Sequence, residues 1–138
     1  MMKFFDEAER RDPRDHQDII FVFGSNLAGR HGAGAAAFAN YWYGAERGVG
    51  CGLTGQSYAI PTKDANMDVL PLRHISRHVL DFLSYAGRHP DKEFFVTRIG
   101  CGYAGYSNPD IAPMFRGAPD NCMFEQSWKE YILPVAQS

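Results

Sequence analysis

The stretch FGSNLAGRHGAGAAAFANYW, residues 23 to 42, joins an apolar run to a segment rich in glycine and alanine. The run IIFVFG (19 to 24) is rich in β-branched and aromatic residues, which is typical of a strand buried on both faces. The alanine-rich segment that follows, up to Gly44, has the small side chains and the length of a helix packed closely on a sheet. The stretch therefore predicts a central strand, a glycine-rich loop and a helix.

Further segments continue this alternation of strands and helices. QSYAIPT (56 to 62) predicts a second strand that ends at Pro61, because proline cannot donate to a sheet ladder. An apolar stripe then predicts a helix of about 15 residues that closes near Gly87. The stripe has spacings of three and four and consists of Leu72, Ile75, Val79, Phe82, Leu83 and Ala86.

The last part of the chain predicts two more strands, EFFVTRIG (93 to 100) and NCMFEQ (121 to 126). Between them SNPDIAPMF opens a helix that Asn108 can cap and in which Pro109 takes the first position. Strands that alternate with helices indicate an α/β fold, here a single three-layer domain with a mostly parallel central sheet. We expect this domain over residues 18–138, after an N-terminal arm of residues 1–17.

The composition restricts the class of protein. With 138 residues, 45% of them hydrophobic, the chain is large enough for one core. A net charge of -2 argues against a surface that attracts nucleic acid as a whole. The cysteines are widely spaced and indicate neither a disulfide framework nor a metal site. We expect a cytoplasmic protein that crosses no membrane and holds no cofactor.

Two glycine-rich segments each follow a predicted strand and lead into a helix. They are GSNLAGRHGAG (24 to 34) and GCGYAGYSNPD (100 to 110). In a parallel sheet both would open at the carboxyl edge, where ligands bind in α/β folds. Glycines allow a close approach of the backbone, and free N–H groups at a helix start favour an anion. Together the two loops predict a phosphate or diphosphate site, although each loop alone is also explained by a tight turn.

At these residues the chain resembles the macrodomain superfamily, which binds ADP-ribose, and in particular its branch of DNA-ADP-ribose and deacylating hydrolases. The similarity lies in the first loop with Asn26 and Gly29, in IPTKD (60 to 64) and in VTRIGCGYAG (96 to 105). The chain is also similar to small phage-encoded and prophage-encoded proteins. That similarity suggests a role in phage–host conflict, in which such a protein neutralises a nucleotide signal.

The resemblance implies a role for each matched residue. Gly32, Ala33 and Gly34 would lie against the diphosphate and the distal ribose, and Asn26 would hydrogen-bond a ribose hydroxyl. The opposite wall would consist of Gly100, Cys101, Gly102, Tyr103, Ala104 and Gly105, with Tyr106 beside them. Lys63 matches the lysine that attacks the distal ribose in these hydrolases, which requires an unprotonated amine. The second loop lacks the acid that assists this lysine in some of them, and Asp64 is the candidate to replace it.

Several residues have plainer alternatives. Arg30 and His31 in the first loop can contact phosphate or form a solvated loop tip. Cys101 invites a role as nucleophile, but small buried cysteines are common as hydrophobic residues. His74 and His78 are spaced to share a metal, yet an exposed polar helix face explains them better.

Three functions follow. The first is a module that binds or sequesters an ADP-ribose-like nucleotide. The second is an ADP-ribosyl hydrolase with Lys63 as nucleophile, acting on modified nucleic acid or protein. The third is a structural or nucleic-acid-binding protein in which the glycine loops are only turns. The residues do not indicate which nucleotide is preferred or whether the chain forms oligomers.

Overall fold

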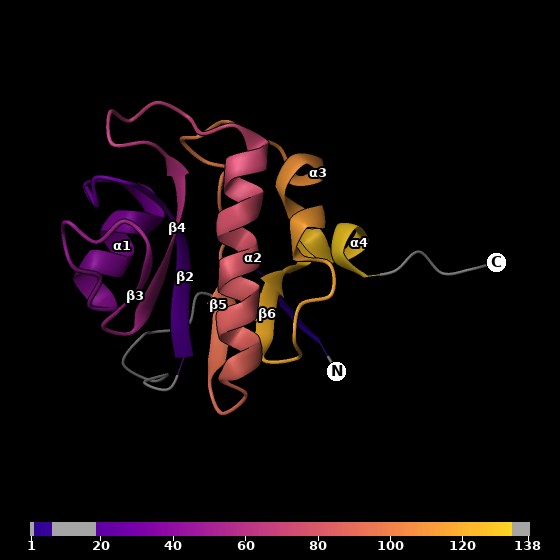
Figure 1. Cartoon of the computed structure of the whole chain (residues 1–138). Coiled ribbons are helices and arrows are strands. Elements are labelled where there is room, and N and C mark those ends of the chain that lie inside the picture. The colour runs from indigo at the N-terminus through magenta and orange to yellow at the C-terminus, as the bar shows by residue number, and fades with distance from the viewer. Residues whose placement is uncertain (1, 7–18, 134–138) are drawn as a thin grey trace.

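The computed structural model describes residues 2–6 and 19–133, which form a six-stranded sheet flanked by helices (Figure 1). The strand order across the sheet is β1-β6-β5-β2-β4-β3. Neighbouring strands are parallel except β3, which runs antiparallel to β4. The strands are β1 (Lys3–Phe5), β2 (Ile19–Asn26), β3 (Gly52–Thr54), β4 (Ser57–Lys63), β5 (Glu93–Val96) and β6 (Cys122–Glu125). The predicted α/β fold with a mostly parallel sheet is therefore confirmed.

Strand β2 is the central element, as its apolar sequence predicts. It pairs with β4 on one side and with β5 on the other. Because side chains alternate along a strand, Ile20 and Val22 enter the core on one face of the sheet, whereas Phe21 and Phe23 pack on the other. A strand whose first five residues are all apolar suits only a place with cover on both faces.

Helices cover the sheet on both faces, so the domain has three layers (Figure 1). One face of the sheet carries α2 (Leu72–Arg88), the short α3 (Asn108–Ile111) and α4 (Lys129–Ile132), with 3₁₀ turns before and after β6. The other face carries α1 (Gly34–Trp42), whose Ala36 and Ala39 lie against Phe21 and Phe23. Alanines at these positions let the helix approach the aromatic side chains of β2.

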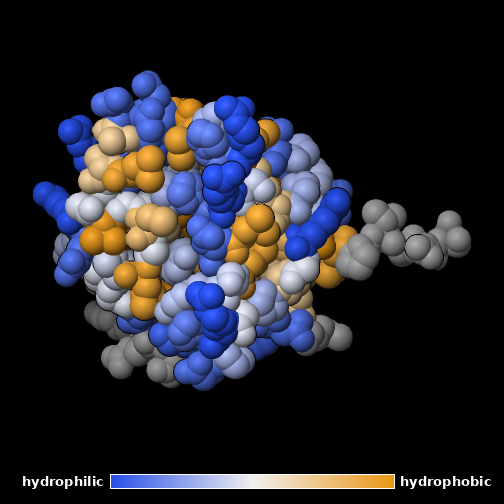
Figure 2. All heavy atoms as spheres, in the orientation of Figure 1, coloured by the Kyte–Doolittle hydropathy of each residue, from blue (hydrophilic) through white to orange (hydrophobic). Residues whose placement is uncertain are grey.

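Helix α2 confirms the predicted apolar stripe, because Ile75, Val79, Phe82 and Ala86 are fully buried. The helix ends one residue after Gly87, close to the predicted position. Its outer face carries a column of hydrophilic side chains (Figure 2). The helix is therefore amphipathic, as its sequence predicts.

Strand β4 continues through Pro61 to Lys63, so the predicted end at Pro61 is wrong. The N–H of Phe21 donates to the carbonyl of Gln56, and by alternation Pro61 therefore turns its nitrogen away from β2. On that other side β3 pairs with β4 only as far as Ala59. The missing N–H of Pro61 thus removes no ladder bond, which is why the strand tolerates it.

The third predicted strand is shorter than expected, because β5 ends at Val96. Thr97 still donates its N–H to the carbonyl of Val22, but the N–H of Ile99 then turns back to the carbonyl of Thr97. This tight turn ends the strand and places Arg98 in the loop that follows. The fourth predicted strand is confirmed as β6.

Helix α3 is capped by Ser107, not by Asn108 as predicted. The carboxylate of Asp110 accepts hydrogen bonds from the backbone N–H and from the hydroxyl of Ser107, at 3.1 and 2.8 Å. Serine followed three residues later by an acid is a capping arrangement, and it moves the helix start to Asn108. The side chain of Asn108 instead accepts hydrogen bonds from Arg98 and Trp128.

Two segments gain structure that their sequences did not indicate. The glycine-rich connection after α1 contains the antiparallel strand β3, which makes the sheet mixed. The segment expected as an N-terminal arm contributes β1, which pairs with β6 and buries Phe5 against Phe95. Residues 7–18 of that arm lie outside the described residues.

Candidate functional site

The two glycine-rich loops meet at one edge of the sheet. Loop 1 (residues 27 to 33) follows β2, and loop 2 (residues 97 to 107) follows β5. Because β2 and β5 are adjacent and parallel, both loops leave the sheet at its carboxyl edge. The approach is close, since a Cβ atom built on Gly24 would lie 3.4 Å from the backbone nitrogen of Gly100.

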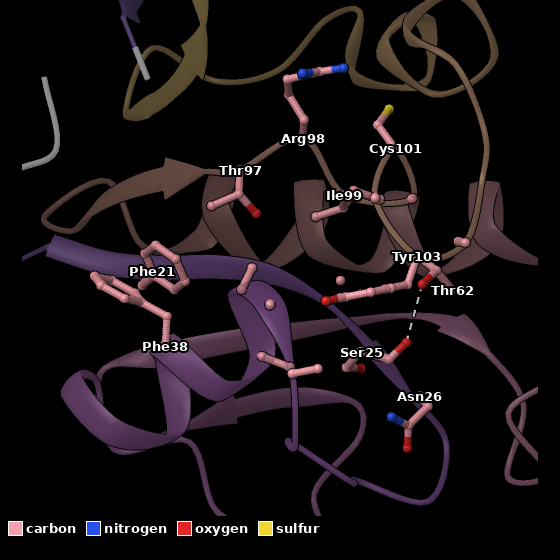
Figure 3. A pocket seen from close by; sticks show the side chains of 18 of the residues that line it. Phe21, Ser25, Asn26, Phe38, Thr62, Thr97, Arg98, Ile99, Cys101 and Tyr103 are labelled. Carbon is pink, nitrogen blue, oxygen red and sulfur yellow. Dashed lines mark hydrogen bonds between the residues drawn. The ribbon is translucent and has the colours of Figure 1, made fainter. Parts of the chain in front are cut away.

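A cavity of about 770 Å³ lies between the loops (Figure 3). Ten of the residues predicted as ligand contacts or as catalytic line it. They are Asn26, Gly32, Ala33, Gly34, Lys63, Gly100, Cys101, Gly102, Tyr103 and Ala104. The cavity therefore gathers residues from β2, loop 1, β4 and loop 2.

Four other predicted residues, Gly29, Asp64, Gly105 and Tyr106, do not line the cavity. Gly29 has φ +69° and lies where a Cβ atom would come 2.3 Å from the carbonyl carbon of Gly48, so it lets two backbone segments cross. The hydroxyl of Tyr106 donates to the carbonyl of Leu70 at 2.7 Å, which ties loop 2 to the segment before α2.

Residues with unpaired backbone N–H groups line the cavity at the start of α1 and in loop 2. Helix α1 begins at Gly34, and the N–H groups of its first turn have no acceptor within the helix. The N-cap residue Ala33 offers no side-chain acceptor to them either. In loop 2, the N–H groups of Gly102, Tyr103 and Ala104 donate to no backbone carbonyl of the described residues. Such unpaired donors favour an anionic ligand.

The charged side chains around the cavity are mostly positive. Arg30, Lys63 and Arg98 line it, whereas Glu125 is the one carboxylate among its described lining residues. The carboxylate of Glu125 accepts a hydrogen bond from the N–H of Ser127 at 2.9 Å. The local charge is thus opposite in sign to the net charge of the chain, -2. An anion would be attracted to this part of the surface.

The far part of the cavity is aromatic. Phe21 lies at its centre, with ring centroids of Phe38 and Phe95 at 5.3 and 6.1 Å. Figure 3 shows Phe21 and Phe38 on the side opposite to Asn26 and Tyr103. The cavity therefore combines a polar region at the strand ends with an aromatic region along the sheet.

Asn26 closes loop 1 on itself. Its amide nitrogen donates to the carbonyl of Arg30 at 2.8 Å, and its amide oxygen accepts from the N–H of Arg30 at 2.9 Å. The side chain is 4% exposed, and the amide keeps one further donor and one acceptor position. Asn26 consequently builds the loop, and a contact to a ribose hydroxyl stays a prediction.

His31 is buried, so the expected solvated loop tip is wrong for this residue. Its Nε2 lies 2.9 Å from the carbonyl of Glu46 and 3.2 Å from that of Val49, and the ring packs edge-on against Phe23. His31 fastens loop 1 to the segment before β3. Arg30, its neighbour, lines the cavity instead.

Lys63 and Tyr103, which both line the cavity, lie close together. The Nζ atom of Lys63 lies 5.7 Å from the centre of the Tyr103 ring, within the range of a cation–π contact. Figure 3 shows the Tyr103 ring lying across the middle of the cavity. The ring is 75% exposed, so it is held by few neighbours.

Cys101 lines the cavity but is poorly suited to act as a nucleophile. Burial raises the pKa of its thiol above the ordinary value of 9.0, and the nearby guanidinium of Arg98 offsets this only in part. Since the thiolate is the reactive form, a thiol with a raised pKa is mostly unreactive near neutral pH.

A metal site finds no support among the described residues, where no three His, Cys, Asp or Glu side chains gather. His74 is exposed and His78 half-buried on α2, away from the cavity lining. In the same part of the chain, no helix has the length and apolar character needed to span a membrane.

Local sequence patterns indicate neither Arg98 nor the aromatic region as part of the site. Arg98 was assigned to a strand, and only the early end of β5 brings it to the cavity. The aromatic residues come from β2, α1 and β5, and no local pattern indicates that they meet.

Comparison of the chain with protein-family models, with curated proteins and with solved structures gave no match.

Proposed function

We propose that this chain binds ADP-ribose, or a related nucleotide that contains it, in the cavity between loops 1 and 2. The chain acts in this proposal as a binding module that sequesters or recognises the nucleotide. The observation that carries the proposal is that residues whose backbone N–H groups have no backbone acceptor, from the first turn of α1 and from loop 2, line one cavity. A diphosphate is the anion that two facing sets of donors can hold from both sides.

The rest of the cavity supports a nucleotide with groups on both sides of its diphosphate. The aromatic region contains the partly exposed ring of Phe38, against which a base can pack. The polar region with Lys63 offers a cation beside the opposite end of the ligand. A cavity of about 770 Å³ lies within the range of small-molecule sites. The resemblance of these loops to those of macrodomains points to the same ligand.

Isothermal titration calorimetry with ADP-ribose tests the proposal. The wild-type chain should release or absorb heat with saturable binding, and Lys63→Ala should weaken binding by about tenfold through loss of one charge contact. Lys92→Ala is the matched control, because Lys92 precedes β5 at the opposite edge of the sheet. The control should bind as the wild type does. An absence of heat at millimolar ADP-ribose would overturn the proposal and leave the glycine loops as turns.

A second candidate function is the hydrolysis of ADP-ribose from an acceptor, because Lys63 lines the cavity at the polar end. Its amine would add to the anomeric carbon of the distal ribose, and the bond to the acceptor would break as the acceptor leaves with a proton. The glycosylamine so formed would open its ring to an imine as the amine proton passes to the ring oxygen, and water would hydrolyse this imine and release ADP-ribose. Asp64 does not line the cavity, and its carboxylate is bonded within a turn.

Turnover assays separate the two functions. A hydrolase should release ADP-ribose from ADP-ribosylated DNA or protein, and Lys63→Ala should abolish release while the product still binds. A binding module should release none, with or without Lys63. Lys92→Ala again serves as the control of folding and charge.

A further inference from the structure

Met67 has an unusual backbone conformation beside the cavity. Among the described residues it is the only non-glycine with a positive φ, +68°. For a residue with a Cβ atom this left-handed conformation is strained, and such strain persists only where the surrounding structure imposes it. Glycine or asparagine would be the ordinary choice at this position.

The turn that imposes this conformation is built by Asp64. Its carboxylate oxygen Oδ1 accepts hydrogen bonds from the backbone N–H groups of Asn66 and Asp68, at 2.9 and 3.0 Å. The backbone of Asp64 adds two bonds, donating to the carbonyl of Asp68 and accepting from the N–H of Met67. Lys63 pairs with Val69 at the base of the turn. The turn is therefore tied at its base and across its middle.

The strained residue lines the cavity and is apolar. Two large apolar residues that line the cavity are exposed, Met67 at 39% and Tyr103 at 75%, and the others that line it are buried or partly buried. Both belong to its polar end, since Tyr103 lies over Lys63 and Met67 belongs to the turn that follows Lys63. A cation together with exposed apolar side chains suits a sugar ring, which has an apolar C–H face and hydroxyl groups at its edge.

We propose that Met67 contacts the distal ribose of the bound nucleotide, and that Asp64 is a positioning residue that holds Met67 there through its turn. This inference rests on the proposed binding of ADP-ribose and specifies which residue recognises its distal sugar. In this inference the carboxylate of Asp64 holds the turn in place. It does not assist Lys63 in catalysis, which is the role that the sequence analysis offered for it.

Binding of ADP-ribose and of ADP, which lacks the distal ribose, tests the contact. Met67→Ala should weaken ADP-ribose binding by about 5- to 20-fold, the loss expected for part of a buried methionine side chain. Its binding of ADP should change by less than about twofold. Val69→Ala is the matched control, because Val69 is an exposed apolar residue of the same turn that does not line the cavity. The control should change neither affinity.

Two aspartate variants test the positioning role. Asp64→Asn keeps the oxygen that accepts both N–H groups and should bind ADP-ribose as the wild type does. Asp64→Ala loses both bonds and should weaken ADP-ribose binding as Met67→Ala does, again without an effect on ADP. Equal loss in Asp64→Asn and Asp64→Ala would show that the charge of Asp64 acts instead, and would overturn its positioning role.

Thermal unfolding tests the strain without a ligand. Met67→Gly and Met67→Ala both lack the side chain, but only alanine keeps the unfavourable conformation, so the glycine variant should melt at the higher temperature. A higher melting temperature for Met67→Ala would contradict the strain.

A wild type that binds neither nucleotide would overturn the proposed function. A wild type that binds ADP-ribose, with Met67→Ala binding it equally well, would overturn this inference alone.

Discussion

Gly34 and Tyr103 touch across the cavity: a Cβ atom built on Gly34 would come 2.9 Å from Cε2 of the tyrosine ring. Gly34 is the first residue of α1, and Tyr103 belongs to loop 2, so the contact joins segments that are far apart in the sequence. The backbone of Gly34 also has φ +57°. The backbone conformation therefore requires glycine, and a Cβ atom at this position would also have to push the Tyr103 ring aside.

Replacement of Gly34 by alanine is expected to lower the free energy of unfolding by about 1–2 kcal/mol, the cost of a left-handed residue with a Cβ atom. Gly32→Ala is the matched control in the same loop, since its Cβ atom would meet nothing within 4 Å. The control should change stability by less than about 0.5 kcal/mol. Urea unfolding measures both variants. Equal midpoints would contradict the structural role of Gly34.

Asn26→Ala should destabilise the chain by about 1–3 kcal/mol, because it leaves the N–H and the carbonyl of Arg30 without their partners in loop 1. Asn66→Ala is the control, since Asn66 is exposed and joins its turn through its backbone N–H. Chemical unfolding of the two variants should differ clearly. If Asn26→Ala were as stable as the control, the amide would not be what closes loop 1.

The thiol of Cys101 should react slowly near neutral pH. Burial raises its pKa above 9.0, so the thiolate fraction, and with it the rate of alkylation, should rise about tenfold per pH unit up to pH 9. Cys51→Ser removes the exposed thiol, and Cys122 stays unreactive because burial raises its pKa to about 12. Mass spectrometry after iodoacetamide treatment measures the rate. A plateau of the rate below pH 8 would show an activated thiolate instead.

Asn108 joins loop 2 to the C-terminal part of the fold. Its amide oxygen accepts from Nε of Arg98 at 3.0 Å and from Nε1 of the fully buried Trp128 at 2.9 Å. Asn108→Ala should lower the free energy of unfolding by about 1–3 kcal/mol, because the indole N–H loses its partner inside the core. Asn108→Asp keeps an acceptor and should be less affected. Thermal unfolding compares them, and equal losses would argue against this bond.

Local patterns predict the elements of this fold well where one face or both faces of an element are buried. The stripe on α2 and the apolar run of β2 are such cases, because burial alone determines their residues. Predictions of element ends were less accurate. Pro61 does not end β4, because its nitrogen points to the side where β3 is absent, and this depends on which strands are neighbours.

The candidate site shows the same division. Glycine loops after two parallel strands predict a shared edge, and the structure brings ten of the predicted residues to one cavity. Asp64 and Gly29 follow the same motifs, yet one builds a turn and the other a backbone crossing. The role that each of these residues takes depends on contacts with residues outside the motif.

The amino-acid sequence by itself determined the alternation of strands and helices, the central place of β2 and the common edge of the two loops, because hydrophobic periodicity and glycine act locally. Only the tertiary structure decided that Arg98 and the aromatic rings around Phe21 join the cavity, and that Met67 stands beside Lys63 in a strained turn. These placements arise from packing between segments far apart in the chain, which no local pattern encodes.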